Sequence, residues 1–525
     1  MKELASLCAA LGAVVGAEYV ISDEGVLAQA ATATFATTAR VLAVVRPGSR
    51  EEVREVLRLA TQHRVPIYPV SGGKNWGLGS RVPPGDAVLL DLGRMNRILD
   101  FDEELATVTL EPGVSFRQLY AFLCEQRSRL FAATTGGSPD GSVVANALER
   151  GDGAGPNGDR ALHLAALEVV LATGEVVHTG FDRFEGASAA RLHRFGVGPA
   201  LDGLFTQSNL GVVTRATVWL APLPRFLAAV RFAVREDAAL GPLVDAIRRL
   251  RLDGTLRSPV GIWNDYRVLS VAERYPFERM LGRTPLSPEV LAEKSAAWGG
   301  QRWLGLASVY AGSEQLGQAA VAHLETELGP RVDELGVDAK SGDPVAGEEL
   351  FPVAEPGFAF LQGVPHEQSL RSMYWRKRTL PPTVPDPDRD GVGLLWLCPL
   401  LPLRGEDVVK AVARAERCLL AHGFEPLLAL VAHGERSAQL LPMIVYDREV
   451  PGADAKALAC HDALLAELAS LGHHPQRLAL PAQDALPLPQ DDYGAVLSRL
   501  ERALDPADVL APGRYDFRKS WPKAR

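Results

Sequence analysis

The residue pattern best suited to chemistry is a glycine-rich segment, Pro69–Gly79, which reads Pro-Val-Ser-Gly-Gly-Lys-Asn-Trp-Gly-Leu-Gly. Glycines let the backbone turn sharply and bring several N–H groups into one concavity, where they bind phosphate oxygens. The segment directly follows the apolar, strand-like run Val65–Tyr68. It therefore indicates a loop that holds a pyrophosphate, although a surface turn uses the same residue types.

Two well-known nucleotide motifs do not fit this segment. Residues 80–85, Ser-Arg-Val-Pro-Pro-Gly, follow the last glycines and cannot begin the helix that a dinucleotide-binding fingerprint requires. Lys74 lies among the glycines, and no Gly-Lys-Ser/Thr triplet leads into a helix as in a Walker loop. A nucleotide bound here needs a fold of another kind.

Two further glycine-rich blocks follow in the sequence. The first covers residues 134–142, continues through Asn146–Gly153 and ends at Asn157-Gly158-Asp159, and the second is Gly196–Thr214. Loops longer than simple turns, which expose backbone in more than one place, suit an extended ligand that carries phosphates and a flat ring. Together these segments make a surface role for each of them the weaker interpretation.

The bulk composition bounds the class of protein. The chain has 525 residues, 47% hydrophobic residues and a net charge of −9, so it can bury a large core and makes a poor partner for nucleic acid. Its five cysteines are scattered without a C-x-x-C pair, which argues against disulfides and against a metal site. Leu4–Val15 has helical spacing, and no apolar run reaches membrane-spanning length. We expect a cytoplasmic protein with no membrane association.

The elements that position the glycine-rich segments alternate between helices and short strands, which favours an α+β fold. The spacing predicts helices over 51–61 and 115–126, strands over 67–70, 87–91 and 106–110, and a hairpin turning at Thr173-Gly174. Pro222-Leu223-Pro224 marks a break, after which helices over 406–421 and 454–471 flank a strand over 440–446. Residues 386–391 are charged and read as a solvent loop.

Four segments together resemble the flavin domain of the vanillyl-alcohol oxidase and p-cresol methylhydroxylase family. They are Ser71–Gly79, the N-x-x-x-R-G run Asn146–Gly153, the D-G-x-F-T-Q-x-x-x-G-V run Asp202–Val213, and the closing stretch Ala503–Arg514. The resemblance covers nearly the whole chain. It implies FAD as the cofactor, and an FAD-dependent oxidoreductase as the activity.

The resemblance also implies an organisation. It predicts an FAD-binding domain of two subdomains over residues 1–225, completed by 485–525, with an inserted α+β substrate or cap domain over 226–484. The residues that it implies for cofactor binding are Ser71, Gly72, Gly73, Lys74, Asn75, Trp76, Gly77, Gly79, Gly136, Gly137, Ser138, Gly141, Asn146, Arg150, Gly151, Gly153, Gly211, Val212, Val213 and Arg514. No metal is expected.

The substrate site departs from the family pattern. In the family, two tyrosines and an arginine bind a para-substituted phenol as its phenolate, which makes the benzylic C–H a hydride donor. Leu78, Ala154 and Gln476 stand where tyrosines are expected, while Arg477 is retained. Because a site built for a phenolate oxygen discriminates through its hydrogen-bond donors, a simple 4-alkylphenol is a doubtful substrate. Arg477 and Gln476 remain candidate catalytic residues, although a surface or ion-paired arginine is the alternative.

Other family features point to further candidates. The resemblance implies two positions for a flavin-linking histidine, which hold Leu394 and Lys74 here. It also implies a position for a flavin-linking tyrosine, which falls at or next to Tyr374, with a packed aromatic or a substrate contact as the alternative. Arg376, in the cluster Arg376-Lys377-Arg378, either belongs to a solvated face or places positive charge over the flavin. His433 and the pair His473-His474 are candidate bases, or are merely packed or exposed.

The expected activity is hydride transfer to flavin N5 from a C–H bond next to an oxygen or an aromatic ring. The expected partners are a small organic substrate and either oxygen or a redox protein as electron acceptor, and a homodimer is possible. Two alternatives stay open. One is a biosynthetic flavoenzyme that acts on a larger or carrier-bound substrate, since Leu78 and Ala154 enlarge the pocket. The other is a flavin-binding protein with weak or lost catalysis.

Overall fold

The computed structural model describes residues 2–380, 384–486 and 491–515, and its first sheet has the strand order β1-β2-β4-β3. Three of these strands, β2, β4 and β3, run parallel. The bounds are β1 (Val20–Ile21), β2 (Val41–Val45), β3 (Ile67–Val70) and β4 (Ala87–Asp91). The accompanying helices are α1 (Lys2–Val15), α2 (Glu24–Ala30) and α3 (Arg50–His63).

Helix α3 illustrates how local sequence fixes an element. The Ser49 hydroxyl caps the helix by accepting a hydrogen bond from the Glu52 N–H at 3.2 Å. The apolar stripe of the helix is fully buried against the first sheet and consists of Val53, Val56, Leu57 and Ala60. The predicted helix over 51–61 is confirmed.

A second, antiparallel sheet has the order β5-β6-β10-β8-β9. Its strands are β5 (Ile98–Asp102), β6 (Thr107–Leu110), β8 (Leu164–Val170), β9 (Val176–His178) and β10 (Val212–Trp219). The helices α4 (Phe116–Glu125) and α5 (Val143–Leu148) pack on it. The predicted hairpin is confirmed, since β8 and β9 pair around a turn in which Gly174 has a φ of 85°.

The largest sheet, called here the large sheet, has eight strands in the order β15-β12-β14-β13-β18-β19-β16, with β17 beside β19. All its pairs are antiparallel. The strands are β12 (Phe226–Val234), β13 (Val260–Asn264), β14 (Trp303–Ala311), β15 (Glu334–Ser341), β16 (Val392–Trp396), β17 (Leu400–Pro402), β18 (Leu427–Ala432) and β19 (Ser437–Asp447).

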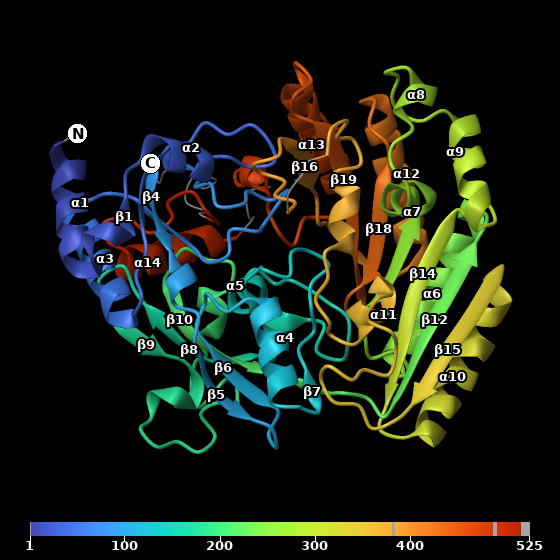
Figure 1. The fold of residues 1–525 in the computed structure, drawn as a ribbon, viewed down its shortest axis with the longest axis horizontal. Helices are drawn as coiled ribbons and strands as arrows, with labels where there is room; N and C mark the ends of the chain where they lie inside the picture. The colour runs from blue at the N-terminus through green and yellow to red at the C-terminus, as the bar shows by residue number, and fades with distance from the viewer. Residues whose placement is uncertain (1, 381–383, 487–490, 516–525) are drawn as a thin grey trace.

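Helices cover one face of the large sheet and leave the other toward the first two sheets (Figure 1). The covering helices are α6 (Leu240–Leu252), α10 (Glu314–Leu328), α12 (Gly405–Ala421) and α13 (Ala453–Ala469). The shorter helices of this part are α7 (Asp265–Ala272), α8 (Phe277–Met280), α9 (Pro288–Ser295) and α11 (Pro356–Leu361). Within the described ranges, no helix is both long enough and apolar enough to cross a bilayer.

The chain returns to the first sheet at its end. Helix α14 (Tyr493–Leu504) lies in the same half of the molecule as α1 and α3 (Figure 1). After it, the Ala511 N–H donates to the Ile67 carbonyl of β3 at 2.8 Å, and the Ile67 N–H donates to the Val509 carbonyl at 2.7 Å. The C-terminal stretch thus pairs with the first residue of β3, while the exact domain limits at 225 and 485 remain predictions.

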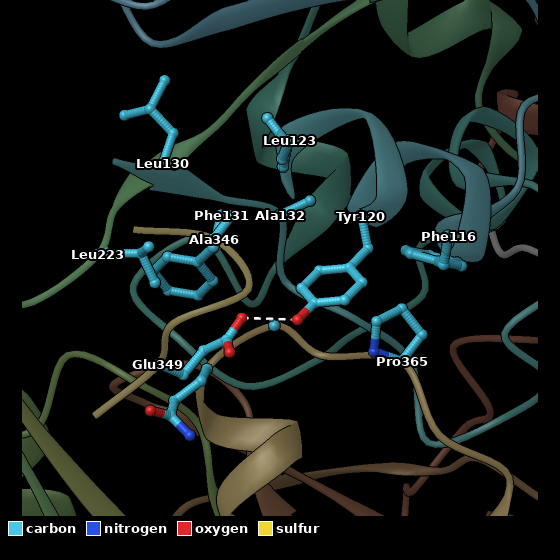
Figure 2. Close-up of a pocket in the computed structure, with 12 residues that line it drawn as sticks. Phe116, Tyr120, Leu123, Leu130, Phe131, Ala132, Leu223, Ala346, Glu349 and Pro365 are labelled. Atoms are coloured by element: carbon cyan, nitrogen blue, oxygen red, sulfur yellow. Dashed lines mark hydrogen bonds between the residues drawn. The ribbon is translucent and has the colours of Figure 1, made fainter. Parts of the chain in front are cut away.

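The two halves also meet along a tightly packed seam. Figure 2 shows α4 and β7 (Leu130–Phe131) against the chain that follows β15, with the Tyr120 hydroxyl donating to Glu349 at 2.6 Å. The pocket at this seam holds only about 10 Å³, close to the volume that one water needs. The seam is therefore packing between the halves, and a ligand site has to be sought elsewhere.

Candidate active site

A cavity of about 230 Å³ opens where β3 ends and the glycine-rich segments converge. Residues far apart in the sequence line it, from Tyr68 in β3 to Arg514 near the C-terminus. The predicted cofactor residues that line it are Ser71, Gly72, Gly73, Lys74, Asn75, Gly137, Ser138, Gly141, Asn146, Gly211, Val212, Val213 and Arg514. Of the predicted catalytic residues, Arg477 lines it as well.

Seven predicted cofactor residues are not part of the lining. They are Trp76, Gly77, Gly79, Gly136, Arg150, Gly151 and Gly153. Arg150 is exposed, and its carbonyl accepts a hydrogen bond from the Gln476 amide at 3.4 Å. The others support the lining from behind: a Cβ on Gly151, for example, would lie 2.0 Å from the Asn146 side-chain oxygen.

The glycine loop, residues 71–79, depends on glycine at two positions. Gly73 has a φ of 64°, a left-handed conformation that side chains disfavour. Gly77 has a φ of 78°, and a Cβ there would lie 2.1 Å from the Trp396 ring of β16. The backbone N–H of Trp396 also donates to the Gly77 carbonyl at 3.1 Å. Glycine therefore lets the loop and the large sheet touch.

An ion pair that sequence reasoning missed lies at one wall of the cavity. Arg514 lies 3.2 Å from the Glu149 carboxylate, which also accepts a hydrogen bond from the Tyr515 hydroxyl at 2.8 Å. Burial opposes ionisation of Glu149, but Arg514 and Arg477 outweigh it and hold its pKa below the ordinary value. Glu149 immediately precedes the predicted Arg150, so its place in the N-x-x-x-R-G run was the available signal.

Arg160, another residue that sequence reasoning missed, ties the second glycine-rich block together. Its guanidinium donates to the carbonyls of Ala133 and Thr134 at 3.1 and 3.0 Å, and to the Asn146 side chain at 2.9 Å. Burial lowers its pKa to about 10, so it remains cationic at neutral pH. This buried cation fixes the backbone that carries Gly151 and Gly153.

Arg477 joins the C-terminal part of the chain to the glycine loop. Its guanidinium donates to the Asn75 side-chain oxygen at 3.0 Å. Within the described ranges no carboxylate forms an ion pair with it, and its Nε is buried without a hydrogen-bond partner. Arg477 therefore forms no direct ion pair within the described ranges, while its charge acts on the nearby Glu149 carboxylate, and its predicted catalytic role stays a prediction.

Gln476, which stands where the family has a tyrosine, belongs to a web of amides. Its carbonyl accepts from the Gln207 side chain at 3.0 Å, and its side-chain oxygen accepts from Gln439 at 3.5 Å. Leu430, on the neighbouring strand β18, belongs to the core on the helix-covered side of the large sheet and therefore points away from the cavity.

His433 lies between two carboxylates. Its ring nitrogens are 3.4 Å from Asp152 and 3.2 Å from Asp159, both in the second glycine-rich block. Burial lowers the pKa of His433, but the two carboxylates outweigh it and raise the pKa to about 10. The imidazole is therefore protonated at neutral pH and does not act as a base there. His473 is buried and His474 is exposed, and neither lines the cavity.

The charged stretch at 386–391 is not a solvent loop, and that expectation is wrong. Asp386 forms an ion pair with Lys74 at 3.2 Å, and Asp388 accepts hydrogen bonds from Ser80 and from the Trp76 indole at 2.7 and 3.1 Å. These contacts clamp the stretch onto the glycine loop. Burial raises the pKa of Asp388 to about 7.

Tyr374 and Arg376 lie outside the cavity lining. The Tyr374 hydroxyl donates to Asp390 at 2.6 Å, and burial and that carboxylate raise its pKa, so it remains a neutral phenol. Arg376 makes two hydrogen bonds to Glu425, at 2.7 and 2.9 Å, and Lys377 is buried. A solvated face is therefore wrong for these two cations. The structure gives Tyr374 and Arg376 partners in the protein, and their predicted catalytic roles stay predictions.

The cavity residues fit an FAD cofactor. Five of the residues that line the cavity are glycines, which expose backbone, the hydroxyls of Ser138 and Ser142 are beside them, and Arg477 and Arg514 supply positive charge. Backbone amides and cations are the groups that a pyrophosphate needs, and the side-chain amides of Asn75 and Asn146 suit the polar edge of a flavin ring. Within the described ranges, no cluster of side chains could hold a metal ion.

Comparison with known proteins agrees with this geometry. A family model described as an FAD binding domain matches residues 41–180. The chain is 47% identical to 1'-carboxy-chondrochloren decarboxylase of Chondromyces crocatus, over 98% of both chains. It is 30% identical to the 4-cresol dehydrogenase [hydroxylating] flavoprotein subunit of Pseudomonas putida, over 90% of this chain and 87% of that one.

Solved structures give the same answer. The crystal structure of p-cresol methylhydroxylase with substrate bound superposes with a TM-score of 0.88 at 25% identity, covering 98% of this chain and 97% of that one. The isoeugenol complex of 4-ethylphenol oxidase from Gulosibacter chungangensis also gives a TM-score of 0.88 at 25% identity, covering 99% and 98%. The chain belongs to the vanillyl-alcohol oxidase and p-cresol methylhydroxylase family.

Membership of this family confirms several predictions. The flavoprotein is an FAD-dependent oxidoreductase with an α+β fold, a two-subdomain FAD-binding domain and a substrate domain. It is an enzyme, since the matched relatives are FAD-dependent enzymes, which removes the support for a protein with lost catalysis. The residues that bind its FAD and the limits of its domains stay predictions.

Proposed function

We propose that this flavoenzyme is an oxidative decarboxylase that acts on a small organic acid. The observation that carries the proposal is the 47% identity, over 98% of both chains, to a protein named as a decarboxylase. That similarity extends through the substrate part as well as the flavin part. The proposal sharpens the expected biosynthetic flavoenzyme by naming the bond that breaks.

The reaction combines two changes in the substrate. In an oxidative decarboxylation the bond between the carboxylate and its α carbon breaks to release CO₂, and a hydride leaves the β carbon for the flavin, so that a double bond forms between the α and β carbons and charge balances. The contribution of the chain is to bind the acid as its anion and to exclude water. Arg477, cationic and without a carboxylate partner in the described ranges, is available for an anion in the cavity.

The phenolate-binding positions of the family support a different substrate. Leu78 is buried in an apolar cluster with Cys398 and Ala479, and Ala154 is buried beside Leu227 and Phe351. Side chains in such surroundings supply no hydrogen-bond donor to a phenolate oxygen. A site without that pair of hydroxyls gains little from a simple 4-alkylphenol.

A second candidate is hydride abstraction without decarboxylation, from a C–H beside an aromatic ring. The 30% identity to the 4-cresol dehydrogenase subunit over 90% of this chain favours it. The name of that relative also describes it as a subunit, which supports a redox protein as acceptor. Oxygen remains the other acceptor, and a homodimer remains a proposal.

The test uses purified holoprotein without oxygen. Carboxyl-¹³C-labelled 1'-carboxy-chondrochloren and labelled 3-arylpropionates are mixed with the oxidised enzyme, and flavin bleaching and labelled CO₂ are measured together. The matched controls are the corresponding carboxamides and a series of 4-alkylphenols. One CO₂ for each reduced flavin is the expected result. Bleaching by 4-alkylphenols or by the amides, without CO₂, would favour the second candidate.

The same samples address the acceptor and the flavin link. After bleaching, admission of air distinguishes direct reoxidation by oxygen from a requirement for another acceptor. Acid precipitation shows whether the yellow chromophore stays with the protein. Release is expected, because the Tyr374 hydroxyl donates a hydrogen bond to Asp390 and does not line the cavity.

A further inference from the structure

Arg267 is a partly buried cation that none of the interactions described so far uses. It lies on α7, directly after β13, and its guanidinium nitrogen lies 3.3 Å from the Met443 sulfur of β19. Its guanidinium carbon lies 5.6 Å from the centre of the Trp396 ring. Trp396 in turn touches Gly77 of the glycine loop. Arg267 is thus one side chain away from the loop that borders the cavity.

Arg267 differs from the other buried arginines in its partners. Arg302 pairs with Asp265 and Glu416, Arg376 pairs with Glu425, and Arg251 donates to three carbonyls. In the part of the chain that the structure describes, the Met443 sulfur and the Trp396 ring are the only interaction partners of the Arg267 guanidinium. A thioether is a weak acceptor, so the charge is left without a counter-ion.

Arg267 lacks a counter-ion although a carboxylate lies close to it in the sequence. Asp265, two residues earlier on the same helix, is paired with Arg302 instead. Burial lowers the pKa of Arg267 to about 10 and no neighbouring carboxylate opposes this, yet the side chain remains charged at neutral pH. Proteins rarely bury such a charge unpaired, because desolvation is costly. An anionic ligand is the natural partner.

The surroundings of Arg267 suggest what the ligand carries besides its charge. Along β13 and β16, Ile262 and Leu395 belong to the helix-covered core, so Trp263 and Trp396 face the other side, toward the flavin part. The Trp263 ring lies over Gly261, where a Cβ would be 2.6 Å away. The Trp396 ring beside the guanidinium, with the Trp263 ring on the same side of the sheet, suits an aromatic or apolar body that bears one carboxylate.

We propose that Arg267 binds the carboxylate of the substrate and selects acids over neutral analogues. The inference rests on the proposed function for its substrate class, but its evidence is the unpaired guanidinium. A planar guanidinium forms two parallel hydrogen bonds with a carboxylate, which fixes the acid in one orientation on the Trp396 ring. Arg477, at the cavity beside Asn75, is then left for another oxygen of the substrate.

The test measures binding rather than turnover. The oxidised holoenzyme is titrated with 3-phenylpropionate and with 3-phenylpropionamide, and the change in the flavin absorbance spectrum gives each Kd. The variants are Arg267→Met, which removes the charge, and Arg267→Lys, which keeps it. Arg231→Met is the matched control, because Arg231 forms an exposed ion pair with Asp338 on β15.

The wild-type enzyme and the Arg231 variant are expected to bind the acid at least tenfold more tightly than the amide. R267M is expected to lose that preference, and R267K to retain part of it. Equal binding of acid and amide by the wild type, or an unchanged preference in R267M, would overturn the proposal. If R267M does not fold, a preference in R267K as large as that of the wild type, with the same Kd, overturns it as well.

The carboxylate site and the decarboxylase activity can fail independently of each other. A preference for the acid that depends on Arg267, without release of labelled CO₂ in the turnover experiment, would leave the carboxylate site standing and remove the decarboxylase. Release of CO₂ with an unchanged preference in R267M would do the reverse.

Discussion

The two sides of the site treat buried positive charge in opposite ways. On the flavin side, Arg514 is buried next to the Glu149 carboxylate, so the chain itself neutralises the charge. On the side of the large sheet, Arg267 is partly buried beside a sulfur and an indole ring. A paired cation suits the rigid wall of a site whose cofactor stays bound, whereas an unpaired cation suits a site whose ligand binds and dissociates.

The largest expected effect comes from breaking the paired side. Glu149→Gln leaves Arg514 buried beside a neutral amide and weakens the hydrogen bond from Tyr515. Breaking one partner of a buried pair costs about 3–5 kcal/mol. We expect loss of that free energy of unfolding, measured by urea titration, together with release of FAD during gel filtration. The exposed Glu325 on α10, changed to Gln, serves as control.

An unchanged urea midpoint and full FAD retention in E149Q would contradict the view that this pair carries the flavin wall. Arg514 would then no longer be an example of a buried cation whose partner stabilises the flavin side.

The contact between the two sides gives the next effect. Gly77→Ala places a methyl group 2.1 Å from the Trp396 ring, at a φ of 78°. Overpacking and a strained backbone together are expected to cost about 2–3 kcal/mol. Gly85→Ala is the matched control, because nothing lies within 4 Å of a Cβ there.

Trp396 fluorescence and the flavin spectrum should change together in G77A, since the ring must move away from the loop. A variant as stable as G85A, with an unaltered spectrum, would show that the loop and the large sheet are not in contact in solution.

A third effect depends on pH. His433 pairs with Asp152 and Asp159, and its pKa is raised to about 10 from an ordinary 6.5. A raised pKa means that the folded state holds the proton more tightly, so the stabilisation is complete below pH 6.5 and is lost as pH rises through 10. His433→Gln is therefore expected to lose about 2 kcal/mol at pH 6 and almost nothing relative to wild type above pH 10.

Urea unfolding at pH 6, 8 and 10 measures this difference. His323→Gln is the control, since His323 and Asp253 form an exposed pair. A difference between H433Q and wild type that stays constant over this pH range would mean that the imidazole acts through packing and not through charge.

Sequence reasoning reached the flavin side because its signals are local. A backbone that must approach a phosphate needs glycine. The glycine-rich loop around Gly73 can therefore be recognised from the sequence without any knowledge of the fold. The same holds for α3, whose cap and apolar stripe lie within a few residues of each other. FAD and the oxidoreductase activity followed from the resemblance of the glycine-rich segments to those of a known flavoprotein family.

The side of the large sheet was not predictable in this way. Arg267 and Trp396 are far apart in the sequence, and nothing in the residues around either one signals the other. The charged stretch at 386–391 was expected in solvent because its partners, Lys74, Trp76 and Ser80, are distant in sequence. Charge predicts exposure only when no counter-ion is folded against it, and that information is long-range.

The smallest expected effect has the opposite sign and tests the unpaired side. Arg267→Met removes a partly buried charge without a carboxylate partner in the described ranges, so substrate-free holoenzyme is expected to gain about 1 kcal/mol of stability. Arg376→Met is the matched control, since it strands the buried Glu425 carboxylate and should lower the melting temperature. A melting temperature of R267M below that of wild type would mean that the guanidinium already has a stabilising partner, and the asymmetry between the two sides would disappear. A rise in melting temperature combined with loss of acid binding is the signature of a residue kept for its ligand at the expense of the fold, which no purely structural arginine would give.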